Sequence, residues 1–289
     1  MKKFFSKIFK SESKDEKYKN LILSKINKFQ NIILNKKNIS FLHYGHLGDI
    51  INSLPVIKEI SKNKKCQLFI QKEKPIPKHV LSRDHPFGNV YLSEKSINKL
   101  LPLLNKQSYL DKVEIFHDQE IDIDLNFFRS LPYNFNMDSI RWYFHLVGVF
   151  PSLNDGWLEL TEENQFKDYI VIMRSLRRQN KFINYSFLEK YKKIVFIGLK
   201  NEFDDLNKQI KNMEYFDSKD FLQLASVIKN AKLFIGNLSF GFALAEAIKV
   251  PRLLESFPNF PMVYPNGKNA YDFYFQNHFE SLVSKLYSK

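Results

Sequence analysis

The stretch Phe41-Leu42-His43-Tyr44-Gly45-His46-Leu47-Gly48-Asp49-Ile50-Ile51 joins an apolar run to two glycines and a carboxylate. This pattern predicts a buried strand, a tight turn, and a helix whose first turn contains Asp49. Glycines at such a junction let the backbone approach a ligand closely. The spacing G-x-x-G-D differs from the dinucleotide fingerprint and from the P-loop, and a simple strand-to-helix turn would also fit it.

A second glycine junction lies near the other end of the chain, in Phe234-Ile235-Gly236-Asn237-Leu238-Ser239-Phe240-Gly241. It also follows an apolar run, so it also predicts a turn at the end of a strand. Two further short motifs lie between the junctions: Arg178-Gln179-Asn180-Lys181, and Gly198-Leu199-Lys200-Asn201-Glu202.

In this order the four motifs resemble those of the family 9 glycosyltransferases, the heptosyltransferase-like group with the GT-B fold. The resemblance covers residues 40–258. It implies an α/β protein with two Rossmann-like lobes, whose parallel sheets face a central cleft. It also implies transfer of a sugar from a nucleotide-diphosphate donor to a cell-surface glycan or glycolipid acceptor, as in lipopolysaccharide or polysaccharide assembly, with neither a cofactor nor a metal.

The resemblance assigns roles to the first loop. Asp49 matches the family's general base, which deprotonates the acceptor hydroxyl. Gly45, His46 and Gly48 form the acceptor-side loop. The alternative for Asp49 is a helix cap, since an acidic residue is favourable in the first turn of any helix.

The resemblance places the donor on the second half of the chain. Its phosphates would contact Arg178, Lys181, Asn237 and Ser239, and its nucleoside would contact the Gly198–Glu202 motif. The run 174–181 contains three of the seven arginines of a chain otherwise rich in lysine, which favours planar recognition of an anion. A solvated basic turn is the alternative, and for Glu202 the alternative is an ordinary helix start.

The chain departs from the family motif at two positions. Leu238 stands where the motif has Asp, and Ala243 stands where it has His. Leucine offers no hydrogen-bonding group for a donor sugar, so heptose is doubtful as the donor. A protein that binds a nucleotide or glycan without turnover is therefore the alternative function.

Strand-like and helix-like segments alternate from Ile39 onward, which predicts parallel sheets with crossover helices. We expect an N-terminal arm at 1–37, an acceptor-side lobe at 38–150 and a donor-side lobe at 157–270. A turn-rich linker separates the lobes. The end of the chain, 271–289, is expected to be helical (Asp272–Leu286), and in GT-B proteins such a helix often crosses back onto the first lobe.

The basic charge is concentrated in the arm. Residues 1–37 contain eleven lysines and three acidic residues, a net +8 within the total of +13. Apolar residues recur at helical spacing, which predicts an amphipathic helix. The apolar face of residues 17–34 would pack either on the protein itself or on a membrane. Residues 1–16 are expected to bind an anionic membrane surface, giving a cytoplasmic protein that is peripheral on the inner face of the membrane.

Other classes of function are disfavoured. A single cysteine, Cys66, excludes a disulfide framework, and no apolar run reaches the ~18 residues of a membrane span. The seven histidines lack metal-binding spacing, so no metal site is expected. Asp122 and Asp124 alternate along a strand-like segment, where a solvated face is favoured over Mg²⁺ binding. The pI of about 9.5 suggests nucleic acid, but the charge lies in one arm and no RNA-binding motif occurs.

Overall fold

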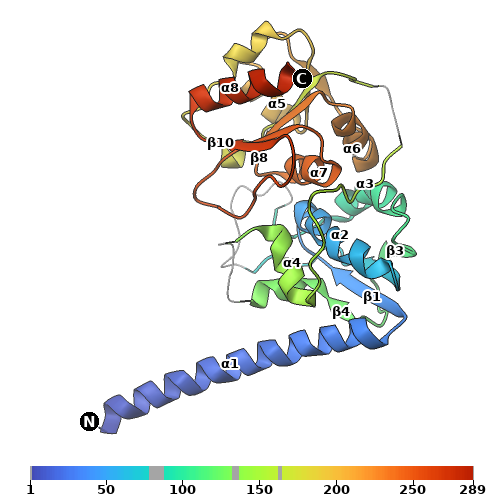
Figure 1. The fold of residues 1–289 in the computed structure, drawn as a ribbon, viewed down its shortest axis with the longest axis vertical. Coiled ribbons are helices and arrows are strands. Elements are labelled where there is room, and N and C mark those ends of the chain that lie inside the picture. The colour runs from blue at the N-terminus through green and yellow to red at the C-terminus, as the bar shows by residue number, and fades with distance from the viewer. Residues whose placement is uncertain (1, 78–87, 132–136, 162–164, 289) are drawn as a thin grey trace.

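The computed structural model describes residues 2–77, 88–131, 137–161 and 165–288, with the side chains of the first helix described from residue 15 onward. Two all-parallel sheets form the centres of two lobes (Figure 1). This arrangement confirms the predicted fold class.

The first lobe contains a four-stranded sheet in the order β3-β2-β1-β4. Its strands are β1 (Asn38–His43), β2 (Lys65–Ile70), β3 (Lys112–Ile115) and β4 (Ile123–Asp124). The accompanying helices are α1 (Lys2–Asn35), α2 (Leu47–Ser61), α3 (Glu94–Asn105), the 3₁₀ helix η1 (Leu125–Ser130) and α4 (Ser139–Val147).

The second lobe contains a six-stranded sheet in the order β10-β9-β8-β5-β6-β7. Its strands are β5 (Ile170–Met173), β6 (Ile194–Ile197), β7 (Glu214–Phe216), β8 (Leu233–Asn237), β9 (Arg252–Glu255) and β10 (Ala270–Phe273). Its helices are η2 (Leu176–Arg178), η3 (Ser186–Lys190), α5 (Lys200–Leu206), α6 (Phe221–Lys229), α7 (Phe240–Ile248) and α8 (Gln276–Tyr287).

The central strands of the second sheet are buried along their whole length. Every residue of β6, β8 and β9 is buried. A parallel strand with both faces covered reads as a continuous apolar run, and Ile194-Val195-Phe196-Ile197 is such a run. The sequence therefore reveals these strands clearly.

The two lobes share one continuous apolar core. Helix α2 of the first lobe contacts α7 of the second, and α3 contacts α6. The connecting segment joins this core through Trp157, whose Nε1 donates a hydrogen bond to the carbonyl oxygen of Ile51 at 3.0 Å. The helices that follow the two glycine junctions, α2 after β1 and α7 after β8, therefore pack against each other.

The end of the chain differs from the expectation. Residues 270–273 form β10, an edge strand paired with β9, and the helix begins only at Gln276. Helix α8 packs on the second sheet and does not cross onto the first lobe. Phe279 explains this placement, because its ring stacks on that of Phe273 at 4.0 Å and is wholly buried.

Helix α1 runs along the first lobe and projects beyond it at its N-terminal end (Figure 1). Phe29 is 1% exposed, and its ring lies 6.2 Å from that of Phe127. Ile22, Ile26 and Ile33 pack against the same core. The interpretation that 17–34 packs on the protein itself is therefore confirmed.

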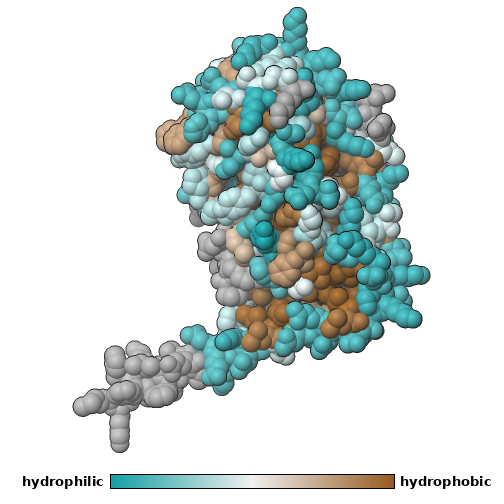
Figure 2. Space-filling model, viewed as in Figure 1, coloured by the Kyte–Doolittle hydropathy of each residue, from teal (hydrophilic) through white to brown (hydrophobic). Residues whose placement is uncertain are grey.

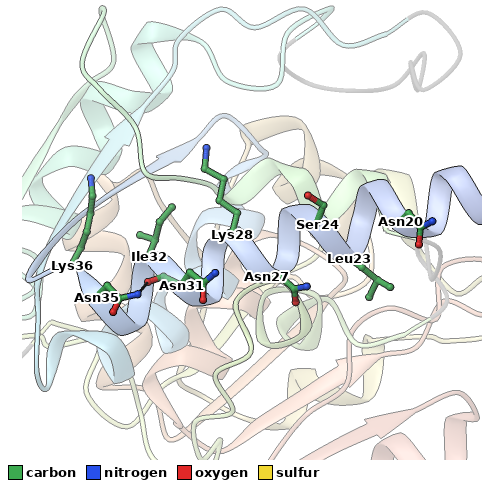
Figure 3. A pocket seen from close by; sticks show the side chains of 9 residues that line it. All are labelled: Asn20, Leu23, Ser24, Asn27, Lys28, Asn31, Ile32, Asn35 and Lys36. Atoms are coloured by element: carbon green, nitrogen blue, oxygen red, sulfur yellow. Dashed lines mark hydrogen bonds between the residues drawn. The ribbon is translucent and has the colours of Figure 1, made fainter.

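The outer face of α1 carries a shallow groove of about 700 Å³. Lys28 and Ile32 point to one side of the helix, whereas Leu23 and Asn27 point to the other (Figure 3). Side chains that diverge in this way do not enclose a ligand. Apolar surface also gathers on the visible face of the first lobe (Figure 2). None of the described helices is long and apolar enough to cross a membrane.

Candidate functional site

The first glycine loop connects β1 to α2 and holds Asp49 at the third position of the helix. The Oδ2 atom of Asp49 accepts a hydrogen bond from the backbone N–H of His46 at 3.1 Å. Asp49 therefore does cap the helix, as the alternative interpretation expected. This bond uses one carboxylate oxygen, so a second role for the side chain is compatible with it.

Gly45 is required by the crowding inside this loop. A Cβ atom at this position would lie 2.6 Å from Cε1 of His43 and 2.8 Å from Oδ2 of Asp49. Neither neighbour can move freely, because both are hydrogen-bonded within the loop. Only glycine lets the strand end and the carboxylate come this close.

Arg129 forms an ion pair with Asp49, with 3.0 Å between Nη2 and Oδ2. Both side chains are partly exposed, Arg129 by 21% and Asp49 by 15%. The guanidinium group lies 4.3 Å from the ring centre of Phe128 and 4.6 Å from that of Tyr91. Sequence reasoning did not select Arg129, because it lies in a 3₁₀ helix eighty residues from Asp49 and belongs to none of the four motifs.

His43 supports the loop from beneath and is wholly buried. Its Nδ1 accepts the N–H of Gly45 at 2.9 Å, so Nε2 carries the proton and donates to the hydroxyl of Tyr143 at 3.0 Å. Burial lowers the pKa of His43 to about 3, against the opposing effect of Asp49. His43 is therefore neutral and fixed in one tautomer at neutral pH.

His46 lies at the start of α2, where its ring is 5.2 Å from that of Tyr91. Burial lowers the pKa of His46 also. Gly48 lies one residue before Asp49, at the contact between the lobes. A Cβ atom at Gly48 would be 3.8 Å from that of Ala243, an ordinary contact distance.

The arginine loop, residues 174–181, follows β5 directly. Arg174 is buried and pairs with both carboxylate oxygens of Glu255, at 2.7 and 2.9 Å. The hydroxyl of Tyr185 donates to the same carboxylate at 2.7 Å. Arg174 therefore holds the loop on the sheet. The sequence alone did not show which of the three arginines has this structural role.

Asn237 holds the same loop from the second glycine junction. Its Oδ1 accepts the N–H of Ser175 at 2.9 Å, and its Nδ2 donates to the carbonyls of Ser175 at 2.7 Å and Arg178 at 3.0 Å. The side chain is wholly buried. Asn237 thus couples the end of β8 to the arginine loop and fixes the backbone from which Arg178 extends.

Arg178 belongs to this loop and is partly exposed. Burial and the neighbouring charge of Arg177 lower its pKa to about 10, and the charge of Asp49 acts in the opposite direction. Its guanidinium group lies 4.7 Å from the ring centre of Phe260. A partly desolvated cation beside a like charge is stabilised by a bound anion, so this position suits a phosphate.

The remaining predicted donor residues lie around the same edge of the second sheet. Lys181 is exposed at the end of the arginine loop. Ser239 precedes α7 and donates its hydroxyl to the carbonyl of Asn237 at 3.0 Å. Glu202 is buried at the start of α5, where it accepts the N–H of Leu199 at 3.2 Å. Its pKa is raised by burial.

Gly198 ends β6 with a φ of +142°, a conformation that L side chains rarely adopt. A Cβ atom here would also lie 3.2 Å from Oε2 of Glu202. The glycine thus brings the backbone close to this carboxylate.

Asp122, just before β4, and Asp124, the last residue of β4, serve the fold. Asp122 accepts hydrogen bonds from Ser40 and pairs with Lys36, and Asp124 caps η1 by accepting the N–H of Asn126 at 2.9 Å. Among the described residues, no group of three or more His, Cys, Asp or Glu is placed to hold a metal ion.

Solved structures share this architecture. No protein-family model matches the chain, and comparison with curated proteins finds no match. The E. coli heptosyltransferase WaaC with ADP-2-deoxy-2-fluoro heptose aligns with a TM-score of 0.55 at 10% identity, covering 86% of this chain and 99% of WaaC. A family 9 glycosyltransferase from Veillonella parvula aligns with a TM-score of 0.50 at 16% identity, over 89% and 90% of the two chains.

A third similar structure is TibC, an iron-containing dodecameric glycosyltransferase of enterotoxigenic E. coli. It aligns with a TM-score of 0.53 at 14% identity and covers 88% of this chain and 79% of TibC. The chain has the heptosyltransferase-like GT-B fold. The resemblance read from four short motifs is confirmed at the level of the fold.

Within this heptosyltransferase-like fold the two departures from the family motif lie in the interior. Leu238 and Ala243 are each 7% exposed. Leu238 follows β8 and Ala243 lies in α7, the helix that packs on α2. Ala243 belongs to the apolar core that the two lobes share, and Leu238 is buried directly after β8.

Proposed function

We propose that this protein transfers a sugar from a nucleoside-diphosphate donor to a hydroxyl group of a cell-surface glycan or glycolipid. The observation that carries this proposal is that the charge of Asp49, on the first lobe, acts on Arg178, on the second. One lobe contributes a carboxylate, the other contributes a partly desolvated cation, and the charge of each acts on the other. Glycosyl transfer requires a base for the acceptor and positive charge for the leaving diphosphate.

The proposed reaction uses Asp49 as the general base on the acceptor side, with Gly45, His46 and Gly48 shaping the loop. Arg178 and Lys181 stabilise the diphosphate as it leaves, and the N-terminal end of α7 at Ser239 adds backbone N–H groups. Because arginine and lysine supply the positive charge, we propose that the reaction proceeds without a metal ion.

Glu202 and Gly198 are proposed to contact the nucleoside. A carboxylate accepts hydrogen bonds from ribose hydroxyls, and burial increases the value of such a bond. Burial raises the pKa of Glu202. Ribose hydroxyls that donate hydrogen bonds to its carboxylate would therefore stabilise the charged form.

A catalytically inactive nucleotide- or glycan-binding protein is the second candidate. Leu238 and Ala243 favour it, because both replace polar motif residues with buried apolar ones. The position of the arginine loop depends on neither Leu238 nor Ala243, because Asn237 and Glu255 hold this loop. This candidate predicts binding of the donor without turnover.

We also propose that the N-terminal end of α1 attaches the protein to an anionic membrane surface on the cytoplasmic side. Phe4, Phe5, Ile8 and Phe9, on which this expectation rests, lie outside the residues whose side chains are described. In the described part of α1, Leu21, Leu23 and Leu34 are exposed by 66%, 47% and 73%. Such side chains suit an interface between water and lipid.

Two measurements test the proposed function. Nucleoside diphosphates should raise the melting temperature of the protein, and the matching nucleosides should raise it much less, because binding stabilises the native state by mass action. With the nucleotide sugar found in this way, Asp49→Asn should lower turnover by ~100-fold or more and leave nucleotide binding intact. Binding without turnover by the wild type supports the inactive alternative, and no binding contradicts both.

A further inference from the structure

The two oxygens of the Asp49 carboxylate have different surroundings. Oδ2 accepts from Nη2 of Arg129 at 3.0 Å and from the N–H of His46 at 3.1 Å. Oδ1 has no hydrogen-bond partner among the residues that the structure describes. Since the carboxylate is 15% exposed, one oxygen is held and the other is available to a ligand.

Arg129 is itself held from several sides. Its guanidinium group lies against the rings of Phe128 and Tyr91, and Nη1 approaches Oδ1 of Asn126 at 3.4 Å. Asn126 is buried and accepts the N–H of Tyr44 at 2.9 Å. The cation is thus fixed relative to the end of β1, where the loop that carries Asp49 begins.

We propose that Arg129 is the positioning residue for Asp49, holding Oδ2 so that Oδ1 alone accepts the proton of the acceptor hydroxyl. This inference rests on the proposed function. In the step, Oδ1 takes the proton, and the hydroxyl oxygen bonds to the anomeric carbon of the donor sugar. The bond from that carbon to the diphosphate breaks, and its electron pair leaves with the nucleoside diphosphate. Arg129 touches none of the reacting atoms.

Electrostatics support this role. The charged and titratable groups that face Asp49 are His43, His46, Tyr143, Arg178 and Arg129. Burial lowers the pKa of both histidines and raises that of Tyr143, which favours their neutral forms at neutral pH. Among the described residues, the two arginines are then the cations that act on the carboxylate. Removing Arg129 should leave the Asp49 side chain freer to rotate.

A substrate-free experiment tests the contact. Arg129→Gln, Asp49→Asn and the double variant form a cycle in which urea unfolding is measured at pH 7. We expect the unfolding equilibrium constant of the double variant to differ by threefold or more from the value that the two single substitutions would give if they acted independently. Arg141→Gln, an exposed arginine on α4, is the matched control and should show no coupling. Independent effects of Arg129 and Asp49 would overturn the proposal.

A kinetic experiment tests the role, using hydrolysis of a nucleoside-diphosphate sugar with water in place of the acceptor. Arg129→Gln should lower kcat at least tenfold with KM within twofold. Arg129→Lys keeps the positive charge, so its kcat should lie between those of Arg129→Gln and the wild type. If Arg129→Gln does not fold, Arg129→Lys is compared with the wild type instead.

A raised KM with normal kcat, or no recovery of kcat in Arg129→Lys, would assign Arg129 to ligand binding or to structure and overturn the inference. No turnover by the wild type on any donor would instead refute the proposed function. In that case the double-mutant cycle still decides whether Arg129 holds Asp49.

Discussion

Acidification should destabilise this protein through His43. The folded loop uses Nδ1 of His43 as an acceptor for Gly45, so the native state requires a neutral ring. Burial lowers the pKa of His43 from 6.5 to about 3. The unfolded chain therefore binds a proton below pH 6.5 while the folded chain does not, and stability falls as the pH decreases from 6.5 towards 3.

The magnitude follows from the two pKa values. One pH unit corresponds to ~1.4 kcal/mol for a group that is protonated in only one state. Between pH 7.5 and pH 4.5, a shift from 6.5 to about 3 removes about 3 kcal/mol of unfolding free energy. That is a large share of the 5–15 kcal/mol that is typical of natural domains.

Urea unfolding at pH 7.5, 6.0 and 4.5 measures this effect. His43→Gln keeps hydrogen-bonding groups but cannot titrate. The variant should be less stable than the wild type at pH 7.5. Between pH 7.5 and pH 4.5, however, its unfolding free energy should fall by about 3 kcal/mol less than that of the wild type. His117→Gln, an exposed histidine of the same lobe, should follow the wild type. Equal acid sensitivity of the wild type and His43→Gln would refute the reasoning.

Three further predictions concern the loops and the arm. Arg178→Ala and Lys181→Ala should each weaken binding of a nucleoside diphosphate by ~1–3 kcal/mol and leave nucleoside binding unchanged in calorimetry; equal losses for both ligands would remove them from the phosphate site. Gly45→Ala should lower the unfolding free energy by ~1–3 kcal/mol through overpacking, whereas Gly48→Ala, with ordinary space, should change it little; similar effects would contradict the crowding argument. Deleting residues 1–16 should abolish co-sedimentation with anionic liposomes at low salt without lowering the melting temperature; a destabilised deletion variant would show that the arm is structural.

The fold could be predicted from sequence because its signals are local. Each central strand is a continuous apolar run, and each glycine junction follows one of them. The exception is β10, whose four residues owe their extended form to pairing with β9. The residues of β10 themselves carry no sequence pattern that indicates this pairing, so Asp272 and Phe273 were expected to be helical.

The site was predictable only where a motif marks it. Asp49 and Arg178 lie in motifs, and the charge of Asp49 acts on the pKa of Arg178. Arg129 lies in no motif, because its contact with Asp49 depends on where η1 packs against β1. Sequence also does not separate the arginines of one run, since Arg174 holds the loop on Glu255 whereas Arg178 responds to the charge of Asp49.

The arginine loop gives a physical reason to expect a ligand. Its anchor, the buried pair of Arg174 and Glu255, requires the desolvation of two charges, which makes such pairs weak contributors to stability. The anchor does, however, fix a short loop that holds Arg178 partly buried beside a like charge. Among the described residues, Arg178 forms no ion pair. A strained arrangement of cations is relieved by an anion, so binding of a diphosphate should both occupy and stabilise the loop.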